Sequence, residues 1–267
     1  MNLKVDTLSA GYGKTPVLRQ ISLCVGPGKI CALMGRNGSG KTTLLRCING
    51  VLPPRAGQVL LMGQDITLLN RKRISRHISL VPQVYVSPFS FLCMDMVLMA
   101  CAPRIHPWAA PGKIDRKKAL KVMAETGIDH MAQRPFNLLS GGERQLVMLA
   151  RGLFQDTPIL LLDEPTAHLD FTNQHRIMAL VRKLAKKRQM TVLITLHDPN
   201  LALYYCDEVI LIHAGQVAAF GPTKPTLTDS VLSTVLGDNI QRDITHKGLS
   251  VVTPKQIISK KNTEVTP

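Results

Sequence analysis

The feature that most constrains this chain is the glycine-rich segment GRNGSGKTT at Gly35–Thr43. It directly follows the apolar run ICALM at Ile30–Met34 and precedes a helical pattern that is closed by Gly50. A strand, a glycine-rich loop and a helix in this order bind phosphate, because backbone N–H groups turn inward and the helix N-terminus adds positive potential. The alternative is a glycine-rich turn before an ordinary helix, and the complete GKT ending argues against it. The segment predicts a nucleotide phosphate site.

Single residues of this loop have separate expected roles. We expect Lys41 to neutralise oxygens of the β- and γ-phosphates and Thr42 to offer its hydroxyl to Mg²⁺. The predicted phosphate-binding set is Gly35, Asn37, Gly38, Ser39, Gly40, Lys41, Thr42 and Thr43.

A second chemical signal is the run ILLLDE at Ile159–Glu164, in which an apolar strand ends in two carboxylates. Parallel α/β sheets bind ligands at the carboxyl ends of their strands. Asp163 is therefore a candidate magnesium ligand, and Glu164 a candidate general base that polarises a water aimed at the γ-phosphate. Alone, such a pair is more often a solvated corner; beside a phosphate loop, the catalytic interpretation is favoured.

The alternation of short apolar runs with helical patterns predicts an α/β fold with a mainly parallel sheet. Three earlier segments alternate with a period near two and are separated by Gly and Pro, which predicts an antiparallel β subdomain: Leu3–Leu8, Val17–Val25 and Gln58–Met62. A proline-broken helical pattern predicts an inserted helical subdomain at about 88–156. Beyond residue 222 the chain becomes polar and rich in turns, and we expect frayed final residues in KKNTEVTP.

Composition narrows the classes of partner. The chain has 33 Lys and Arg against 18 Asp and Glu, a formal charge of +15, which favours an anionic partner. Aromatic residues are only 4%, too few for a base-stacking nucleic-acid platform. The six cysteines form no CxxC pair and suit reduced, buried thiols. We expect no signal sequence and no membrane span, because polar residues and proline interrupt the most apolar stretch, Val84–Pro103.

A third signal is LSGGERQ at Leu139–Gln145, where Ser140, Gly141 and Gly142 stand at the start of a helical pattern. A hydroxyl, exposed amides and the helix dipole would make a second anion site. The alternative is a simple helix cap. One ATP does not easily fill two such sites within one chain.

Together these motifs resemble those of ATP-binding cassette (ABC) proteins, over about residues 2–222. GRNGSGKT is similar to the family's Walker A loop, ILLLDE to its Walker B strand, and LSGGE to its signature sequence in a Gln-to-Glu variant. Four smaller family marks follow the family's order: Tyr12, where an aromatic stacks on adenine, Gln83 of the Q-loop, Asp170 of the D-loop and His197, the switch histidine.

The resemblance implies an ABC ATPase domain over 1–222, a C-terminal extension of unknown role over 223–267, and ATP with Mg²⁺ as ligands. The implied catalytic residues are Glu164, His197 and Gln83, and the implied metal ligands are Thr42, Gln83 and Asp163. The resemblance also implies a head-to-tail homodimer. In that dimer Ser140 and Gly142 of one copy reach the γ-phosphate held by Lys41 of the other. Gly141 and Asp170 also belong to the implied nucleotide-binding set.

The switch segment LHDPNLALYYCDEVILIHAGQVAAFGP at Leu196–Pro222 resembles ATPase subunits of importers for iron-siderophore complexes, haem and cobalamin. Such subunits lie on the cytoplasmic face of the membrane, bind permease subunits, act indirectly with an external substrate-binding protein and bind no nucleic acid. Pro199, Ala100 and Cys101 depart from the subfamily pattern. The segment FSFLCMDMVLMACAPRIHPW at Phe89–Trp108 is a candidate permease contact, or part of the helical subdomain's own core. The alternative function is a soluble ABC ATPase of iron-sulfur cluster assembly.

Overall fold

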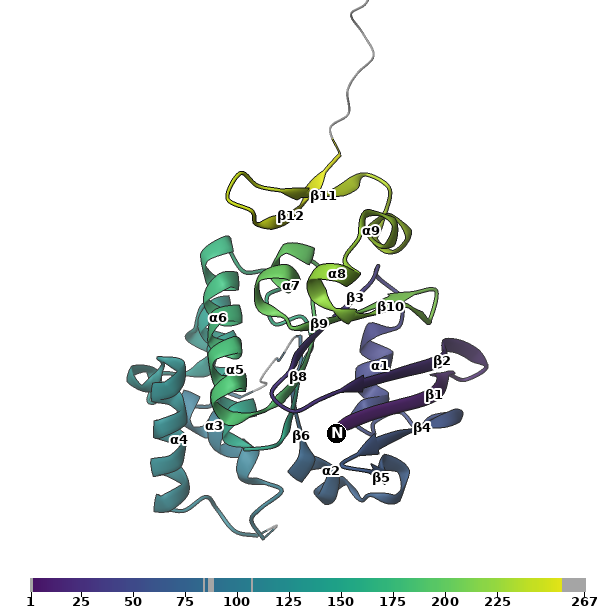
Figure 1. The fold of residues 1–267 in the computed structure, drawn as a ribbon. Helices are drawn as coiled ribbons and strands as arrows, with labels where there is room; N and C mark the ends of the chain where they lie inside the picture. Colours follow the sequence, from purple (N-terminus) through teal and green to yellow (C-terminus); the bar gives the residue numbers. More distant parts are fainter. Residues whose placement is uncertain (1, 84, 86–88, 107, 256–267) are drawn as a thin grey trace, which may run out of the picture.

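A six-stranded sheet forms the centre of the molecule (Figure 1). The computed structural model describes residues 2–83, 85, 89–106 and 108–255. The sheet's members are β3 (Ile30–Met34), β6 (Ile78–Val81), β7 (Ile159–Leu162), β8 (Thr191–Thr195), β9 (Glu208–His213) and β10 (Gln216–Pro222). Their order is β10-β9-β3-β8-β7-β6, and every neighbouring pair is parallel except β10 with β9. The predicted mainly parallel sheet is therefore confirmed.

Every residue of the central strands β3 and β8 is buried, because both faces of the sheet are covered. Successive side chains of β3 enter two different cores. Ile30, Ala32 and Met34 join the core shared with the helices, whereas Cys31 and Leu33 join the core on the other face. This two-sided burial explains why the strand reads as an uninterrupted apolar run.

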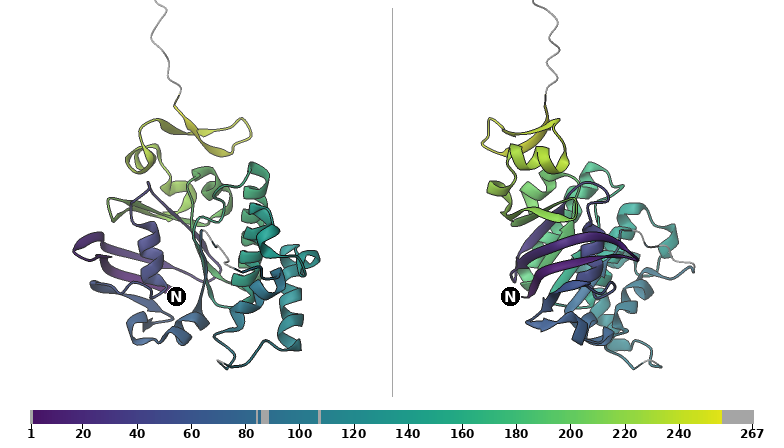
Figure 2. Two further views of the ribbon diagram at one scale, coloured as in Figure 1. Left: turned by 180° about the vertical axis from the view of Figure 1, so that it is seen from behind. Right: turned by 90° about the vertical axis from the view of Figure 1, so that its right-hand side faces the viewer.

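An antiparallel sheet covers that second face, together with α1 (Lys41–Ile48). Figure 2 shows this sheet on the side opposite the larger helices. Its members are β1 (Leu3–Tyr12), β2 (Thr15–Val25), β4 (Ala56–Leu61) and β5 (Gln64–Asp65), in the order β2-β1-β4-β5. The short helices η1 (Ile66–Leu68) and α2 (Arg71–His77) follow it. The predicted antiparallel subdomain is confirmed.

The helices of the inserted subdomain predicted at about 88–156 pack on the first face of the central sheet. They are α3 (Cys93–Leu98), η2 (Met99–Cys101), α4 (Lys113–Thr126), η3 (Asp129–Met131), η4 (Phe136–Leu138) and α5 (Gly141–Phe154), with α6 (Phe171–Arg188) and α7 (Pro199–Tyr205) farther along the chain. Met94 and Met96 are buried in the core, whereas Phe89 remains 68% exposed. The apolar segment that begins at Phe89 thus places some side chains in the core and others on the surface. Ala100 and Cys101, which depart from the subfamily pattern, are also buried.

An ion-pair cluster joins α4 to α6. Lys187 Nζ donates to Glu125 Oε1 at 2.9 Å, and the Arg188 guanidinium donates to Glu125 Oε2. Hydrogen bonds from Lys187 and Arg188, together with their charges, lower the pKa of Glu125 against the opposing effect of burial.

We expect Glu125→Gln to lower the free energy of unfolding by about 1 kcal/mol at pH 7, as for a partly exposed ion pair. A carboxyl group whose pKa is lowered on folding stabilises the fold above its unfolded pKa of about 4.3, and this contribution is lost as the pH falls through the folded pKa. Urea denaturation of both proteins across pH 3 to 8 measures the difference. A difference that stays constant with pH would assign the effect to packing.

All six cysteines are free thiols, and five of them are buried. Burial raises the pKa of Cys47 to about 11. Within the described residues, no helix is both long and apolar enough to cross a membrane.

The C-terminal extension folds against the core as far as residue 255. It comprises α8 (Thr223–Thr226), α9 (Asp229–Leu236), β11 (Ile240–Ile244) and β12 (Ser250–Pro254). Leu227, Leu232 and Val235 are buried in the same core as Ile30. In Figure 1 this unit, in yellow, lies at one end of the molecule beside α7. The frayed end expected in KKNTEVTP lies outside the described residues.

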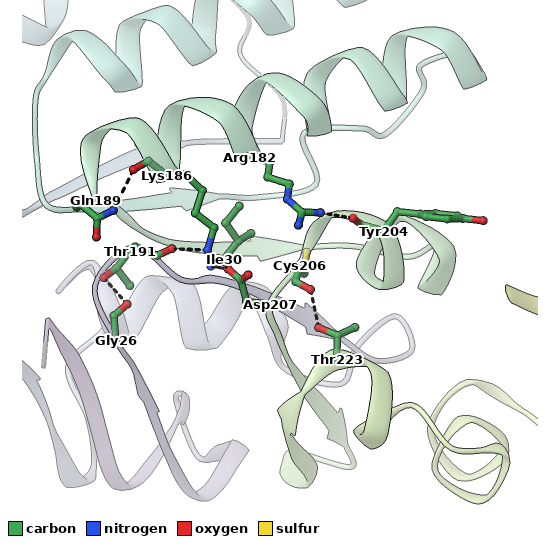
Figure 3. A network of polar contacts seen from close by, with 11 residues as sticks. Gly26, Ile30, Arg182, Lys186, Gln189, Thr191, Tyr204, Cys206, Asp207 and Thr223 are labelled. Atoms are coloured by element: carbon green, nitrogen blue, oxygen red, sulfur yellow. Dashed lines mark hydrogen bonds and ion pairs between the residues drawn. The ribbon is translucent and has the colours of Figure 1, made fainter. Parts of the chain in front are cut away.

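Asp207 links the start of the extension to the core by hydrogen bonds (Figure 3). Its carboxylate oxygen Oδ2 accepts hydrogen bonds from the Ile30 N–H and from Lys186 Nζ, both at 2.9 Å. Its carbonyl accepts the Thr223 N–H at 3.1 Å, and the Thr223 hydroxyl donates to the Cys206 carbonyl at 2.9 Å. Asp207 therefore joins strand β3 and helix α6 through its carboxylate, and the extension through its backbone carbonyl.

A second contact between the core and the extension lies on α7. The Asn200 side-chain amide donates to the Val252 carbonyl at 3.1 Å and accepts the Val252 N–H at 2.8 Å, as a neighbouring strand would. Pro199, the departure from the subfamily pattern, occupies the first turn of α7, where a missing N–H costs nothing. Asp198 caps the same turn by accepting the Asn200 N–H.

Candidate functional site

The predicted phosphate loop lies between β3 and α1, as expected. Gly40 adopts φ +110°, and a Cβ there would lie 2.6 Å from Leu18 Cδ2, so any other residue would strain the backbone and displace Leu18. Gly38 adopts φ +78°, and nothing lies within 4 Å of where its Cβ would be. Gly38 and Gly40 both line an open cleft, so the backbone of this loop is accessible to a ligand, as a phosphate cradle requires.

Lys41 is 6% exposed, and its ammonium forms hydrogen bonds with the phosphate loop. Lys41 Nζ donates to the carbonyls of Gly35 at 2.8 Å and Arg36 at 3.1 Å. Burial lowers the pKa of Lys41, and the nearby carboxylates of Glu164 and Asp163 oppose that shift. The hydroxyl of Ser39 is buried without a hydrogen-bond partner among the described residues. Both groups can donate to phosphate oxygens.

The two predicted carboxylates leave β7 in different directions. Glu164 has φ +49°, in the left-handed region, which turns the chain directly after Asp163. Thr195, at the end of β8, donates its hydroxyl to Asp163 Oδ1 at 3.0 Å and accepts the Glu164 N–H at 2.6 Å. Burial raises the pKa of Asp163, although the Thr195 hydrogen bond opposes this. One threonine therefore holds the Asp163 carboxylate and the Glu164 backbone, and sequence reasoning had not identified it.

The three predicted catalytic residues meet at the Glu164 carboxylate. The Gln83 Nε2 group donates to Glu164 Oε2 at 2.7 Å, and His197 Nε2 lies 2.7 Å from Glu164 Oε1. These residues come from three chain segments, each of which follows a different strand of the sheet: β6, β7 and β8. The arrangement can orient a carboxylate for proton abstraction from water.

These residues line an open cleft of about 730 Å³. Its predicted members are Asn37, Gly38, Gly40, Lys41, Thr42, Thr43, Gln83, Glu164 and His197. Val17, Ala167 and His168 also line it and were missed by sequence reasoning. His168 directly precedes the D-loop Leu169–Asp170, so its place in the motif was the available signal.

The oxygen atoms near this cleft fit a hard divalent cation, which prefers carboxylate, hydroxyl and amide oxygens. Thr42 offers an exposed hydroxyl, and Asp163 a carboxylate. The side-chain nitrogen of Gln83 is bonded to Glu164, which leaves its oxygen available for a metal.

The remaining predicted residues lie outside the lining of this cleft. Ser140 caps α5 by accepting the Glu143 N–H at 3.3 Å, while Glu143 Oε2 accepts the Ser140 N–H at 2.8 Å. Asp170 caps α6 by accepting the Asn173 N–H at 2.8 Å. Gly141 and Gly142 form the first turn of α5. Each cap stabilises its helix start, and the signature segment is not part of this chain's own cleft lining.

Comparisons with known proteins agree with this geometry. The family model described as ABC transporter matches residues 18–167. The chain is 36% identical over 252 residues to a hemin import ATP-binding protein of Bordetella bronchiseptica, a match that covers 91% of this chain and 94% of the relative. It is 38% identical over 232 residues to a cobalamin import ATP-binding protein of Halobacterium salinarum, which covers 87% of this chain and 58% of that longer protein.

The fold is similar to a solved structure described as an inward-facing metal-chelate type ABC transporter, with a TM-score of 0.84 and 30% identity. That match covers 96% of this chain and 98% of the other. Sequence motifs, cleft geometry, family model and fold agree. The chain therefore belongs to the ABC transporter family, as one of its ATP-binding ATPase subunits.

Proposed function

We propose that this ATPase powers the uptake of a ferric siderophore complex, with haem second and cobalamin third as candidate cargo. It works on the cytoplasmic face of the membrane, on a transmembrane permease that receives cargo from an external substrate-binding protein. The observation that carries the proposal of an iron-containing cargo, the class that includes ferric siderophores and haem, is similarity over nine tenths of the chain to a hemin import ATP-binding protein. The fold similarity to a metal-chelate type transporter supports the same cargo class.

The working unit is a head-to-tail homodimer. Ser140 caps a helix whose N-terminal dipole favours an anion, yet the residues lining the cleft around Lys41 do not include it. In a head-to-tail pair, Ser140 and Gly142 of one copy reach the nucleotide held by the second copy. ATP then joins the two halves, and hydrolysis releases them.

In the hydrolytic step, Glu164 accepts a proton from the attacking water as the water oxygen bonds to the γ-phosphorus. The bond from phosphorus to the bridging oxygen breaks, and ADP leaves. His197 holds Glu164 in position and contacts the γ-phosphate. Thr42, Asp163 and Gln83 would hold Mg²⁺, which when bound offsets charge on the phosphate oxygens.

The rival candidate is a soluble ABC ATPase of iron-sulfur cluster assembly, whose switch histidine usually lies in a THYQ-like context. This chain has LHDPNLAL instead. A nucleic-acid function fits less well, because such cassette proteins carry two cassettes or a long coiled-coil insertion.

Uptake of labelled cargo tests the proposal directly. A deletion strain is expected to lose energised uptake of a ferric siderophore, and the Lys41→Ala protein is expected not to restore it. If siderophore and haem uptake persist while cobalamin accumulation collapses, the cargo ranking is wrong and the motor role survives.

A separate prediction concerns the permease contact. Phe89 is 68% exposed and packs edge to face on Phe91 with ring centroids 5.9 Å apart. Phe91 and Leu92, which the sequence also suggested, are half-buried, so their substitution would disturb the fold as well. Loss of an aromatic anchor at an interface centre costs at least ~2 kcal/mol. We therefore expect Phe89→Ser to weaken co-sedimentation with membranes when the neighbouring operon genes are co-expressed.

The matched control for this experiment is Phe220→Ser, which removes a 39% exposed phenylalanine from β10. ATP binding should persist in both variants. Native protein that stays in the soluble fraction beside its operon partners would contradict the importer function.

A further inference from the structure

Two arginines from separate segments hold the turn that carries Tyr12. Arg46, on α1, donates to the Tyr12 hydroxyl with an Nη1–Oη distance of 2.8 Å. Arg55, just before β4, donates to the carbonyls of Gly13 at 2.7 Å and Thr15 at 3.3 Å. The turn between β1 and β2 is thus fixed at its ring and at its backbone.

The Arg46 contact leaves the Tyr12 ring free to stack. The guanidinium carbon lies 5.9 Å from the ring centroid, well beyond the roughly 3.5–4 Å of stacked planar groups. Tyr12 is 43% exposed. A base can therefore lie on the ring while the hydroxyl stays bonded to Arg46.

Arg46 also links the helix that follows the phosphate loop to Tyr12, the predicted adenine contact. Its helix begins at Lys41, so the arginine stands about 6 Å along the axis from Thr42, at 1.5 Å of rise per residue. The same rigid element therefore holds the predicted phosphate ligands at its start and the Tyr12 hydroxyl one turn later. An exposed tyrosine without this contact would sample several rotamers, each of which misplaces the stacking surface.

We propose that Arg46 and Arg55 are positioning residues for the base of ATP: they hold the Tyr12 ring at a fixed distance from the phosphate loop. This rests on the proposed function, in which Tyr12 stacks on adenine. The two arginines affect the base and not the phosphates, so their contribution exists only for a ligand that carries a base.

Titration calorimetry of the full-length protein with ATP and with inorganic tripolyphosphate, each with Mg²⁺, separates the affinity due to the base from the affinity due to the phosphates. Because stacking of a base on an aromatic side chain stabilises the complex, we expect Tyr12→Ala to lower ATP affinity by about tenfold or more. We expect Arg46→Ala and Arg55→Ala to weaken ATP about threefold to tenfold, and tripolyphosphate affinity to stay unchanged in all three. Arg73→Ala, which removes an exposed cation from α2, is the matched control and should change neither affinity.

A double-mutant cycle tests the specific contact. Tyr12→Phe keeps the ring and removes the hydroxyl, so it should weaken ATP as much as Arg46→Ala does, and the double variant should lose no more than either single variant. Arg46→Lys, which keeps a donor, should restore part of the affinity. Circular dichroism melts confirm that each variant is folded.

The outcomes distinguish the two levels of the hypothesis. Normal ATP affinity in both Arg46→Ala and Tyr12→Phe, or an equal loss for ATP and tripolyphosphate, would overturn the positioning role while Tyr12→Ala still reports stacking. Normal ATP affinity in Tyr12→Ala would instead overturn the role of Tyr12 on which the inference rests.

Discussion

Replacing Glu164 by glutamine is expected to slow ATP hydrolysis by about 100-fold or more, because a positioned general base contributes typically 10²–10⁴-fold. Glutamine keeps the size of the side chain and one acceptor oxygen, so the contacts to Gln83 and His197 persist in part. The amide does not accept the proton of the attacking water. ATP affinity should therefore stay close to normal, and an ATP-bound dimer should accumulate on size exclusion with ATP and Mg²⁺.

Glu125→Gln is the matched control for this prediction, since it makes the same chemical change at the α4–α6 ion pair, away from the cleft lining. Its turnover should stay near that of the native protein. A Glu164→Gln protein that hydrolyses ATP at the native rate would remove Glu164 from the mechanism.

Loss of the Lys41 ammonium is expected to act on binding instead of turnover. The amine donates two hydrogen bonds to loop carbonyls, and because Lys41 lines the cleft its third N–H can donate to a phosphate oxygen. Charge-assisted hydrogen bonds contribute about 1.5–3 kcal/mol each. Lys41→Ala should therefore weaken ATP affinity by roughly 30-fold or more.

Calorimetry with ATP and Mg²⁺ measures this loss, and Lys183→Ala, at an exposed position on α6, controls for a change in net charge. ATP affinity within a factor of two of native in Lys41→Ala would show that the loop does not hold the nucleotide as described.

Local patterns predicted those parts of the fold that local chemistry determines. An apolar run, a glycine loop and an N-terminal lysine specify β3 and α1 within the segment itself, and the helix observed ends at Ile48, two residues before the predicted stop at Gly50. Long-range contacts left no such signal. Nothing in the sequence indicates that Arg46 meets Tyr12, because the contact depends on how α1 packs against the antiparallel sheet.

In the apolar segment after the Q-loop, too, the sequence did not show which side chains make long-range contacts. Composition alone does not say which face of a helix turns inward, so Met94 and Met96 could be assigned to the core only when α3 was seen against α5. Thr195 was missed for a related reason. A threonine at the end of an apolar strand has no distinctive pattern, and its role comes from the two carboxylates that the neighbouring strand delivers beside it.

The contacts between the C-terminal extension and the core limit how far the chain can be shortened. A fragment that stops at Pro222 would strip the apolar cover that Leu227, Leu232 and Val235 give to the central core. It would also leave the Asn200 amide without either of its two backbone partners, at the start of the helix that follows the His197 loop. The shortest useful expression fragment therefore runs past β12, because truncation at Pro222 would remove contacts that support the central core and the start of α7.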